Sequence, residues 1–350
     1  MNSIMNRILL SLLVACFNIG FVQSQNFSGQ YISEWQWGMN GKTNMVNQLR
    51  LEMNVPLGSE RNTLQAATLH VAKTSDSVID DWQGFSNIDA DNIFAAIAVL
   101  GYMHEWKHGR LFLGVRNVNE DFFTSSITSL FTNSSGGIFP TIAASYPIAN
   151  YPLSGLTVYF DLTRGDFTFR NSIYNGRGYK GWTRGDNPLI VRPGRDGLFN
   201  MSQLEYSHGG TQLFAGAALH TRQFPVDDEG EMQPESSCLS KASCAWWIYG
   251  EQTLWTDADR SVACIAQYSE NTRSDNSCRR FAEVGCAYSD SRDECALSFQ
   301  YARFRQGGER SLELTWKRQI GKAALQPSFQ YVANANGNFT VLSARLYYSF

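Results

Sequence analysis

Side chains able to exchange hydrogen bonds with a polar solute are concentrated in one long segment, residues 118–154. The segment is rich in asparagine, serine and glycine, and two acidic residues lie near its start. Amide, hydroxyl and carboxylate groups can replace the water around a hydroxyl-rich molecule such as a sugar. A stretch this long without a helix signal is more often functional than idle. The residues in it that we expect to contact a solute are Asn119, Glu120, Asp121, Asn133 and Ser134.

A second set of polar residues alternates with aliphatic residues elsewhere in the chain. Between Leu156 and Leu162, for example, Thr157, Tyr159 and Asp161 alternate with leucine, valine and phenylalanine. Because a β-strand places successive side chains on opposite faces, each such segment has one polar and one apolar face. The polar-face residues that we expect to line the same interior as residues 118–154 are Glu52, Arg110, Arg116, Tyr159, Asp161, Arg170 and Arg345.

Alternating segments of this kind continue to the last residue. From Asn338 to Phe350 the pattern alternates and stops on an aromatic side chain, as the C-terminal signal of bacterial outer-membrane barrels does. An apolar face on one side and a polar face on the other suit a strand with lipid outside and water inside. The pattern predicts sixteen strands, at residues 29–39, 43–55, 62–72, 93–106, 109–117, 155–163, 166–174, 199–208, 212–223, 244–256, 261–269, 280–288, 293–304, 310–320, 323–332 and 338–350. In 62–72 and in 244–256, polar and apolar residues are mixed on both faces.

The predicted connections alternate between short and long. Tight turns are predicted at 107–108, 164–165, 208–211, 256–260 and 321–322. Long connections are predicted at 73–92, 118–154, 175–198, 224–243 and 270–279. With the C-terminus in the periplasm, every one of these turns is periplasmic and every long loop is external, as in outer-membrane barrels. Residues 39–42 form a short external exception, which the hairpin signal Asn40-Gly41 explains.

These patterns predict an all-β fold, a transmembrane antiparallel β-barrel of about sixteen strands with short periplasmic turns and longer extracellular loops. Hydrophobic residues make up 43% of the chain, yet the mean hydropathy is −0.28, because apolar positions are interleaved with polar ones. A net charge of −3 argues against nucleic acid as a partner. The lumen of such a barrel is wide enough for an aqueous channel. We expect residues 118–154 to fold into it; the alternative is a loop packed over the rim.

The N-terminal segment has the features of a secretory signal. A basic residue precedes a mostly apolar run from Ile8 to Val22, and small residues follow at the cleavage positions. We therefore divide the chain into a signal peptide, 1–24, and a barrel domain, 25–350. An anchor helix and lipidation at Cys16 are the alternatives. The predicted location is the bacterial outer membrane, reached through the periplasm.

Six cysteines remain after the predicted signal is removed, which suggests disulfide bonds in an exported chain. They are Cys238, Cys244, Cys264, Cys278, Cys286 and Cys295. Their positions around predicted turns favour three pairs in chain order: Cys238 with Cys244, Cys264 with Cys278, and Cys286 with Cys295. Their spacing matches no zinc site, and the histidines are scattered. We expect neither a metal nor a cofactor.

Several motifs together resemble the carbohydrate-selective porin family of the OprB type. Arg116 to Phe123, read with Leu130 to Gly137, is similar to the segment after the fifth strand in that family. Further similar pieces are Gln83 to Ile88, Glu251 to Trp255, Tyr301 to Phe304 and Leu325 to Val332. Each piece is weak alone, but their order and spacing from about residue 80 to the C-terminus are specific together.

The resemblance implies an outer-membrane channel for the passive diffusion of small carbohydrates, with the long loop inside the pore. Its implied partners are small saccharides, outer-membrane lipids and, through Phe350, the barrel-insertion machinery; a homo-oligomer is left open. The chain departs from the family in being shorter and in its cysteines. It also has Asn133-Ser134-Ser135-Gly136-Gly137 where the family has an aromatic residue before the last glycine. This loss puts the degree of sugar preference in question.

Three other functions compete with this interpretation. A general diffusion porin of low selectivity would have the same strands and loops. A barrel enzyme would need a histidine beside an acid and a nucleophile, but His108 and His208 fall in predicted turns and no G-x-S-x-G motif is present. A soluble exported β protein would not sort its loops by length. We therefore expect a channel and not an enzyme.

Overall fold

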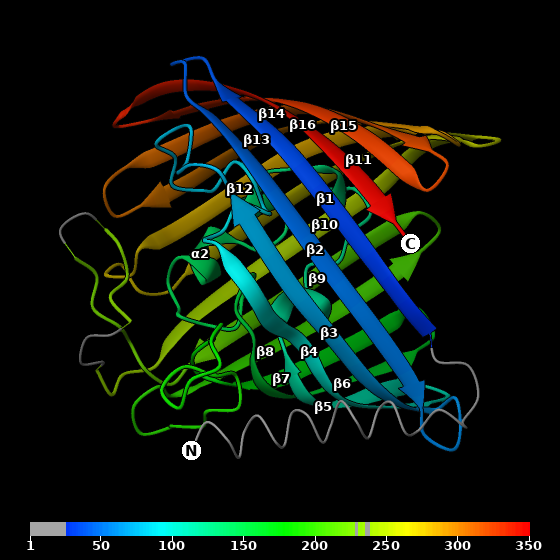
Figure 1. The fold of residues 1–350 in the computed structure, drawn as a ribbon, viewed down its shortest axis with the longest axis vertical. Helices are drawn as coiled ribbons and strands as arrows, with labels where there is room; N and C mark the ends of the chain where they lie inside the picture. The colour runs from blue at the N-terminus through cyan, green and yellow to red at the C-terminus, as the bar shows by residue number, and fades with distance from the viewer. Residues whose placement is uncertain (1–25, 228–229, 235–238) are drawn as a thin grey trace.

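The computed structural model describes residues 26–227, 230–234 and 239–350. The predicted signal segment, 1–24, lies outside the described residues, as do Cys16 and Cys238. Antiparallel strands form one closed barrel in which each strand pairs with its neighbours in sequence and β1 pairs with β16 (Figure 1). The predicted fold class is confirmed. Within the described ranges, no helix is long and apolar enough to cross a membrane.

All sixteen predicted strands are present, with ends that differ from the predicted ones by a few residues. They are β1 (Asn26–Gly38), β2 (Thr43–Pro56), β3 (Asn62–Lys73), β4 (Ile93–Trp106), β5 (Gly109–Arg116), β6 (Gly155–Arg164), β7 (Phe167–Asn175), β8 (Leu198–His208), β9 (Thr211–His220), β10 (Ser243–Asp257), β11 (Arg260–Asn271), β12 (Cys278–Ser289), β13 (Asp293–Phe304), β14 (Gly308–Ile320), β15 (Ala323–Asn334) and β16 (Gly337–Ser349).

The seam between β1 and β16 closes the barrel and includes the last residue. Glu34 lies opposite Arg345 in its register. Beyond the end of β16, the N–H of Gly29 donates to the carbonyl of Phe350 at 2.9 Å, and the N–H of Phe350 donates back at 3.0 Å. A Cβ at Gly29 would lie 2.4 Å from the Phe350 ring, so a larger residue there would require the ring to move. The seam leaves neither edge strand unpaired.

Short turns gather at one end of the barrel, as the sequence predicts. The other end carries the long connections 74–92, 117–154, 176–197 and 221–242. Short connections also occur at that end, at 305–307 and 335–336 as well as at 39–42. The long loop predicted at 270–279 is a correction, because strands β11 and β12 extend into it and leave only 272–277 between them. The long loops are therefore confined to the connections from β3 to β10.

The two faces of each strand differ as the alternation requires. In β14, the outward side chain of Leu314 is 53% exposed, whereas its inward neighbour Glu313 is 1% exposed. The two strands that mix polar and apolar residues on both faces, β3 and β10, pair irregularly with a neighbour. The register of β10 against β11 shifts between Thr253 and Trp255, and the register of β3 against β4 shifts at two places. Such bulges change which face a side chain occupies, so strict alternation fails there.

Replacing Leu314 with lysine is expected to destabilise the barrel in a lipid bilayer by about 2–4 kcal/mol, because a charge at mid-depth would face hydrocarbon. Urea unfolding from phospholipid vesicles measures the change, with Leu314→Ala as the control for lost apolar area. Equal stability of the lysine and alanine variants would show that water, and not lipid, surrounds this face.

Candidate functional site

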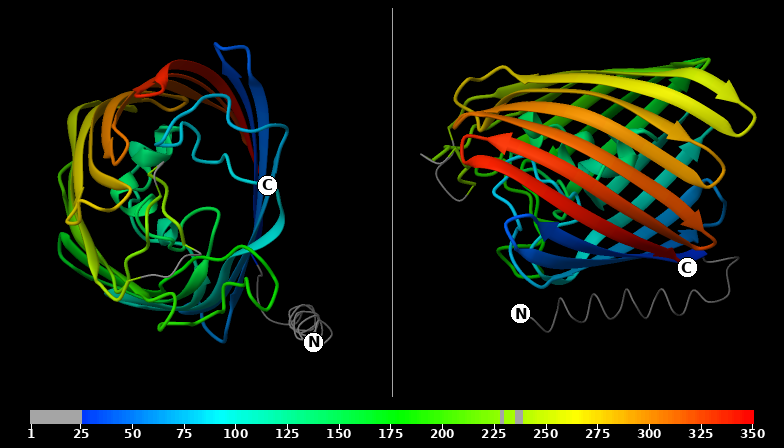
Figure 2. Two further views of the ribbon diagram at one scale, coloured as in Figure 1. Left: turned by 90° about the vertical axis from the view of Figure 1, so that its left-hand side faces the viewer. Right: turned by 90° about the horizontal axis from the view of Figure 1, so that it is seen from above.

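The loop between β5 and β6, residues 117–154, lies inside the barrel (Figure 2), and we call it the inner loop. It is built from short helical turns: η1 (Val118–Glu120), η2 (Thr128–Leu130), η3 (Ser134–Gly136) and α2 (Pro140–Ala143). The α2 turn contacts β11 and β12 on the far wall. This path places the loop across the lumen, between the two sides of the wall.

The sequence of the inner loop explains its turns. The side-chain oxygen of Asn117 accepts the N–H of Asn119, and that of Asn133 accepts the N–H of Ser135, so each asparagine begins a 3₁₀ turn. Pro140 occupies the first turn of α2, where a missing N–H costs nothing. The helical content is a correction to the sequence analysis, which found no helix signal, because single turns started by local caps leave no 3.6-residue pattern.

Glu313 of β14 attaches the middle of the inner loop to the wall. Its carboxylate accepts the N–H of Thr132 at 2.6 Å, the hydroxyl of Thr132 at 2.8 Å and the N–H of Asn133 at 3.1 Å. From β15, the amide of Gln326 donates to the carbonyl of Leu130 at 2.6 Å. These contacts satisfy backbone groups that the loop cannot satisfy itself.

Ion pairs attach the start of the inner loop to the opposite wall. Arg116, at the end of β5, lies 2.6 Å from Asp121, and both side chains are less than 5% exposed. The Arg116 guanidinium also lies over the Phe112 ring at 3.9 Å, and Arg170 of β7 donates to the carbonyl of Asp121. Burial raises the pKa of Asp121 to about 7, and the positive charge of Arg116 opposes that shift.

A second loop, residues 74–92, bends over the rim and holds the inner loop from above; we call it the bridging loop. Its Gly84 carbonyl accepts the N–H of Ser134 at 2.8 Å, and its Asn87 N–H donates to the carbonyl of Thr132 at 2.7 Å. Glu309 of β14 accepts two backbone N–H groups of the bridging loop, each at 2.8 Å. The bridging and inner loops therefore form one hydrogen-bonded unit.

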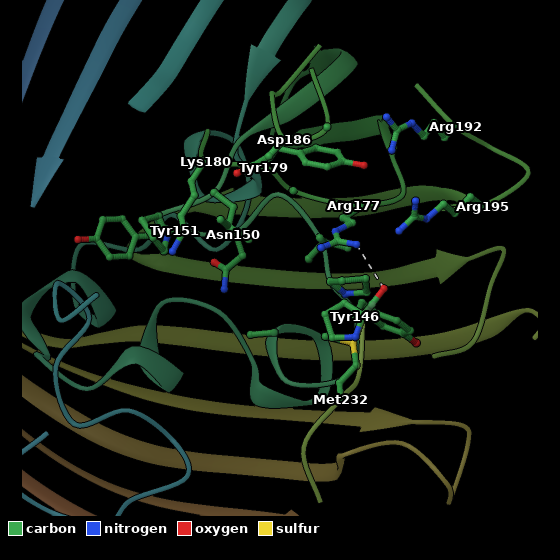
Figure 3. A pocket seen from close by; sticks show the side chains of 18 residues that line it. Tyr146, Asn150, Tyr151, Arg177, Tyr179, Lys180, Asp186, Arg192, Arg195 and Met232 are labelled. Carbon is green, nitrogen blue, oxygen red and sulfur yellow. Dashed lines mark hydrogen bonds between the residues drawn. The ribbon is translucent and has the colours of Figure 1, made fainter. Parts of the chain in front are cut away.

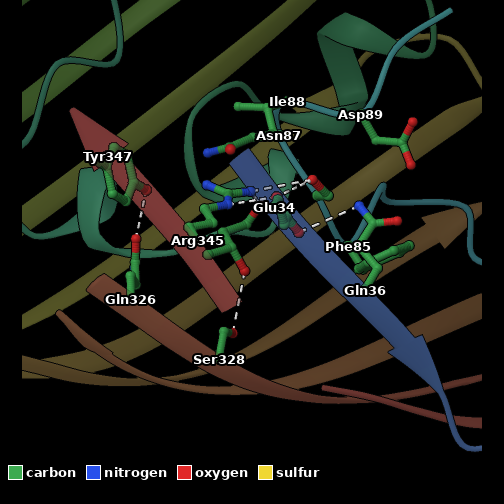
Figure 4. Close-up of polar contacts among 12 residues, drawn as sticks. Glu34, Gln36, Phe85, Asn87, Ile88, Asp89, Gln326, Ser328, Arg345 and Tyr347 are labelled. Carbon is green, nitrogen blue, oxygen red and sulfur yellow. Dashed lines mark hydrogen bonds and ion pairs between the residues drawn. The ribbon is translucent and has the colours of Figure 1, made fainter. Parts of the chain in front are cut away.

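The seam of the barrel also contacts this unit. Arg345 of β16 donates to Glu34 of β1 at 2.6 Å, and the two side chains are 3% and 0% exposed (Figure 4). Ser86 of the bridging loop donates to the same carboxylate at 2.9 Å. Arg345 also donates to the hydroxyl of Ser86 and to the carbonyl of Thr132. Both loops and both edge strands thus meet at one buried ion pair.

A cavity of about 440 Å³ lies at the face of the inner loop. All of its lining residues belong to the inner loop except Asn87, which belongs to the bridging loop. The lining is neutral and polar apart from two phenylalanines: Asn87, Asn119, Phe122, Phe123, Thr124, Ser125, Ser126, Thr128, Ser129 and Gly137.

Phe123 has an unusual backbone in this cavity. Its φ is +61°, a left-handed conformation that bulky side chains rarely adopt. Its ring makes edge-on contact with Phe139 at 5.0 Å between centroids and a tilted contact with Trp247 of β10 at 5.2 Å. Aromatic packing therefore holds a partly exposed ring at the cavity in spite of the backbone strain.

A larger cavity of about 590 Å³ lies nearer the outer end, between the last part of the inner loop and the loops after β7 and β9 (Figure 3). Tyr146 and Tyr151 come from the inner loop, and Arg177 donates to the carbonyl of Pro234 at 3.3 Å. Burial raises the pKa of Tyr146 and Tyr151 above the usual range, so both hydroxyls stay neutral donors. Basic and aromatic side chains share this lining.

The structure divides the predicted site residues into partly exposed and buried groups. Partly exposed are Glu52, Arg110, Asn119, Glu120, Ser134 and Arg170. Buried are Arg116, Asp121, Asn133, Tyr159, Asp161 and Arg345. The buried group lies between the inner loop and the wall, or within the wall, and its polar atoms make ion pairs and hydrogen bonds there. A direct role for either group in lining the pore stays a prediction.

Most of the predicted charged residues occur in pairs. Arg110 lies 2.6 Å from Asp161, which also accepts the Tyr159 hydroxyl at 2.8 Å. Glu120 of the inner loop accepts two bonds from Arg50 of β2, at 2.7 and 3.2 Å. Because opposite charges face each other, no ring of one sign forms among these residues, and strong ion selectivity is not expected from them.

Four residues that matter to this site are absent from the predicted set of site residues: Arg50, Asn87, Phe123 and Glu313. The alternation of the strands does predict that Arg50 and Glu313 face the lumen. A signal existed for Glu313, because an acid in the middle of a strand's polar face must find a buried partner or water. Phe123 lies beside the predicted acidic residues of the inner loop, but nothing local indicates which of two adjacent phenylalanines keeps its ring partly exposed.

The cysteine pairing proposed from the sequence is not supported. Cys244, Cys264, Cys278, Cys286 and Cys295 are free thiols in the structure. Cys264 and Cys278 lie near opposite ends of neighbouring strands, so that pair is wrong. Cys286 lies opposite Leu297, and Cys295 opposite Tyr288, so this pair is offset by two residues. Cys238 lies outside the described residues, so its predicted pair with Cys244 stays a prediction.

The histidines do not form a metal or nucleophile site in the described structure. His208 lies 3.1 Å from Asp166 at a periplasmic turn, and both side chains are exposed. His220 is buried, with its Nε2 at 2.7 Å from the Gly176 carbonyl. Within residues 26–227, 230–234 and 239–350, no three His, Cys, Asp or Glu side chains are grouped as metal ligands would be.

Comparisons with known proteins identify the fold. No family model matches the sequence, and no curated protein does. Among solved structures, OprB of Pseudomonas putida, determined at high pH, matches with a TM-score of 0.77 at 14% identity, over 93% of this chain and 94% of that one. A triple mutant of the Rhodopseudomonas blastica porin matches with a TM-score of 0.61 at 8% identity, over 93% and 100%.

A third match is OmpT, an outer membrane protein of Vibrio cholerae described in a trimer form, with a TM-score of 0.57 at 9% identity over 93% and 99% of the two chains. At these identities the matches establish the architecture. The protein therefore has the closed transmembrane barrel fold of the porins, with a loop folded into the barrel.

Proposed function

We propose that the protein is an outer-membrane porin through which small carbohydrates diffuse passively, with the inner loop forming the narrow part of the pore. The cavity at the face of the inner loop carries this proposal. It combines neutral amide and hydroxyl groups with the partly exposed ring of Phe123. Polar groups of this kind replace the hydration of sugar hydroxyls, and an aromatic ring packs against the apolar face of a pyranose.

Three further points belong to the same proposal. The apolar outer face suits outer-membrane lipids, and the exposed ring of Phe350 at the seam suits recognition by the barrel-insertion machinery. The trimer form described for OmpT makes a homo-oligomer the expected assembly. The pairing of opposite charges among the predicted interior residues of the described chain favours neutral solutes, and passive diffusion requires no catalytic group.

The OprB-type resemblance leads us to expect an aromatic residue in the inner loop that this chain lacks, and the Phe123 ring offers a replacement for it. Gly136 stands where that family has an aromatic, but Phe123 supplies a ring to the cavity from another position of the same loop. Sugar preference can therefore be retained without the usual aromatic. A general diffusion porin of low selectivity is the alternative, and it predicts no dependence on this ring.

Replacing Phe123 with alanine is expected to weaken the block of ion current by a saccharide such as glucose or maltose about threefold to tenfold, because an aromatic contact contributes about 0.5–1.5 kcal/mol. The measurement is noise analysis or titration of single channels in planar bilayers. Phe123→Tyr keeps the ring and is expected to retain the block.

Phe94 supplies the matched control, because its side chain is exposed outside this cavity. Phe94→Ala is expected to leave sugar block and conductance unchanged. Liposome swelling should also be faster with small sugars than with neutral non-sugar solutes of similar size. Channels that conduct ions but show no sugar block in any variant would favour the low-selectivity porin, whereas an absence of conductance would refute the pore itself.

A further inference from the structure

Three cysteines lie on the outward face of neighbouring strands near their periplasmic ends. Cys264 is in β11, Cys286 in β12 and Cys295 in β13. Their neighbours Ile265, Ala287 and Ala296 are buried in an inward-facing cluster, so the three thiols point away from the lumen. The cysteines therefore lie outside the pore and outside both cavities.

Cys264 and Cys286 are direct cross-strand partners in the register of β11 and β12. Directly opposite residues on one face of an antiparallel pair have Cβ atoms about 4.5–5.5 Å apart. A disulfide needs Cα atoms about 4.4–6.8 Å apart, which any directly opposed pair satisfies. Because they are opposite each other in an antiparallel pair, the two side chains also lie on the same, outward face of the sheet.

Other pairings of these cysteines are less suitable. Cys278 precedes Cys286 by eight residues along β12, which puts it about 27 Å from the position opposite Cys264 at about 3.4 Å per residue. Cys295 lies opposite Tyr288, two residues from Cys286, and such diagonal neighbours are about 7–8 Å apart. The register thus selects one pair among the described cysteines.

We propose that Cys264 and Cys286 form a cross-strand disulfide in the exported protein, joining β11 to β12 near the periplasmic end. This rests on export to an oxidising compartment, as the proposed outer-membrane function requires. One thiolate attacks the disulfide of a thiol–disulfide oxidase and forms a mixed disulfide. The second thiolate then displaces the oxidase, which leaves as a dithiol. The two thiols lose two protons and two electrons, and the oxidase disulfide accepts the electrons.

The bond would fix the register of β11 at a place where the neighbouring pairing is irregular. Across β11, strand β10 shifts register between Thr253 and Trp255, opposite Ala263 and Val262. A strand beside a bulge has weaker constraints on its register. A covalent link one residue away, at Cys264, prevents β11 from slipping against β12.

Trypsin makes this proposal directly testable, because cleavage after arginine gives each relevant cysteine its own peptide. The peptides are residues 261–273, 274–279, 281–292 and 293–303, with Cys264, Cys278, Cys286 and Cys295 respectively. Cells producing the full chain are quenched with N-ethylmaleimide, and the outer-membrane fraction is digested without reductant and analysed by mass spectrometry. The expected result is a linked pair of peptides 261–273 and 281–292, with Cys295 alkylated.

Two variants sharpen the test. Cys286→Ser is expected to make Cys264 fully alkylated, whereas Cys295→Ser is expected to leave the linked pair intact. Full alkylation of both Cys264 and Cys286 in the wild-type outer-membrane protein, or a link from either to another cysteine, would overturn the proposal. Because neither thiol faces the pore, the Cys264→Ser, Cys286→Ser double variant should conduct as the wild type does, so the disulfide and the pore can fail independently.

Discussion

Replacing Arg345 with leucine is expected to lower the free energy of unfolding by about 3–5 kcal/mol, because it leaves a buried carboxylate without its counter-charge. Glu34 is 0% exposed, and Arg345 lies 2.6 Å from it. The substitution also removes the donors that reach Ser86 and the carbonyl of Thr132. Urea unfolding followed by tryptophan fluorescence in phospholipid vesicles measures the change.

The matched control also removes the negative charge of Glu34, which the single substitution leaves without a partner. Arg345→Leu combined with Glu34→Gln is expected to recover a large part of the lost stability, since the cost of the single substitution comes mainly from the uncompensated carboxylate. Equal destabilisation of the single and double variants would show that the arginine contributes through packing and not through charge.

Replacing Glu313 with alanine is expected to raise single-channel conductance and to abolish sugar block, because the inner loop loses its attachment to the wall. The carboxylate accepts three hydrogen bonds from Thr132 and Asn133, and each bond to a charged group contributes about 1.5–3 kcal/mol. Without it, two backbone N–H groups of the loop are left buried and unpaired, which favours a loop displaced toward water. Planar-bilayer recording measures both quantities.

Glu283 of β12 provides the control for this variant. It is also a buried acid on the inner wall, but its side-chain partners are the strand residues Gln267 and Gln300. Glu283→Ala is therefore expected to leave conductance and sugar block near those of the wild type. Unchanged conductance in folded Glu313→Ala would mean that the inner loop does not narrow the pore.

The strands could be predicted because their pattern is local. Hydrocarbon outside and polar groups inside impose strict alternation on every regular strand, and residues such as Leu314 and Glu313 follow it. The pattern fails in β3 and β10, where bulges add residues that no short-range rule locates. Fold class therefore follows from the sequence more directly than the course of each strand does.

The cysteines of β11 and β12 show how an error in the predicted position of a turn leads to the wrong cross-strand partner. The connection between β11 and β12 spans 272–277, and Cys264 and Cys286 are nearly equidistant from its centre. The pair of Cys264 with Cys278 was predicted because both flank an expected turn at 269–277. In the structure, Cys278 begins β12, whereas Cys264 lies seven residues before the end of β11 at Asn271, so the two cysteines are not equally far from the turn.

The candidate site was only partly predictable, because burial depends on contacts between distant parts of the chain. Arg116 and Arg345 were expected at the interior and lie there, but the inner loop covers both of them. Whether an inward side chain meets water or the loop depends on the path of residues 117–154, which Glu313 and the bridging loop determine. Phe123 is recognisable only once that path is known.

The seam between β1 and β16 has a consequence for how the molecule must be assembled. The pair of Glu34 and Arg345 joins the first strand to the last, residues 311 positions apart in sequence, and contacts of such large separation form late in folding. Since Ser86 and Thr132 contact the same pair, the two loops acquire their final support only when the ends of the chain meet. A chain in which β1 and β16 have not yet paired would therefore enclose a wide opening. The width of the passage would be fixed only when these two strands pair.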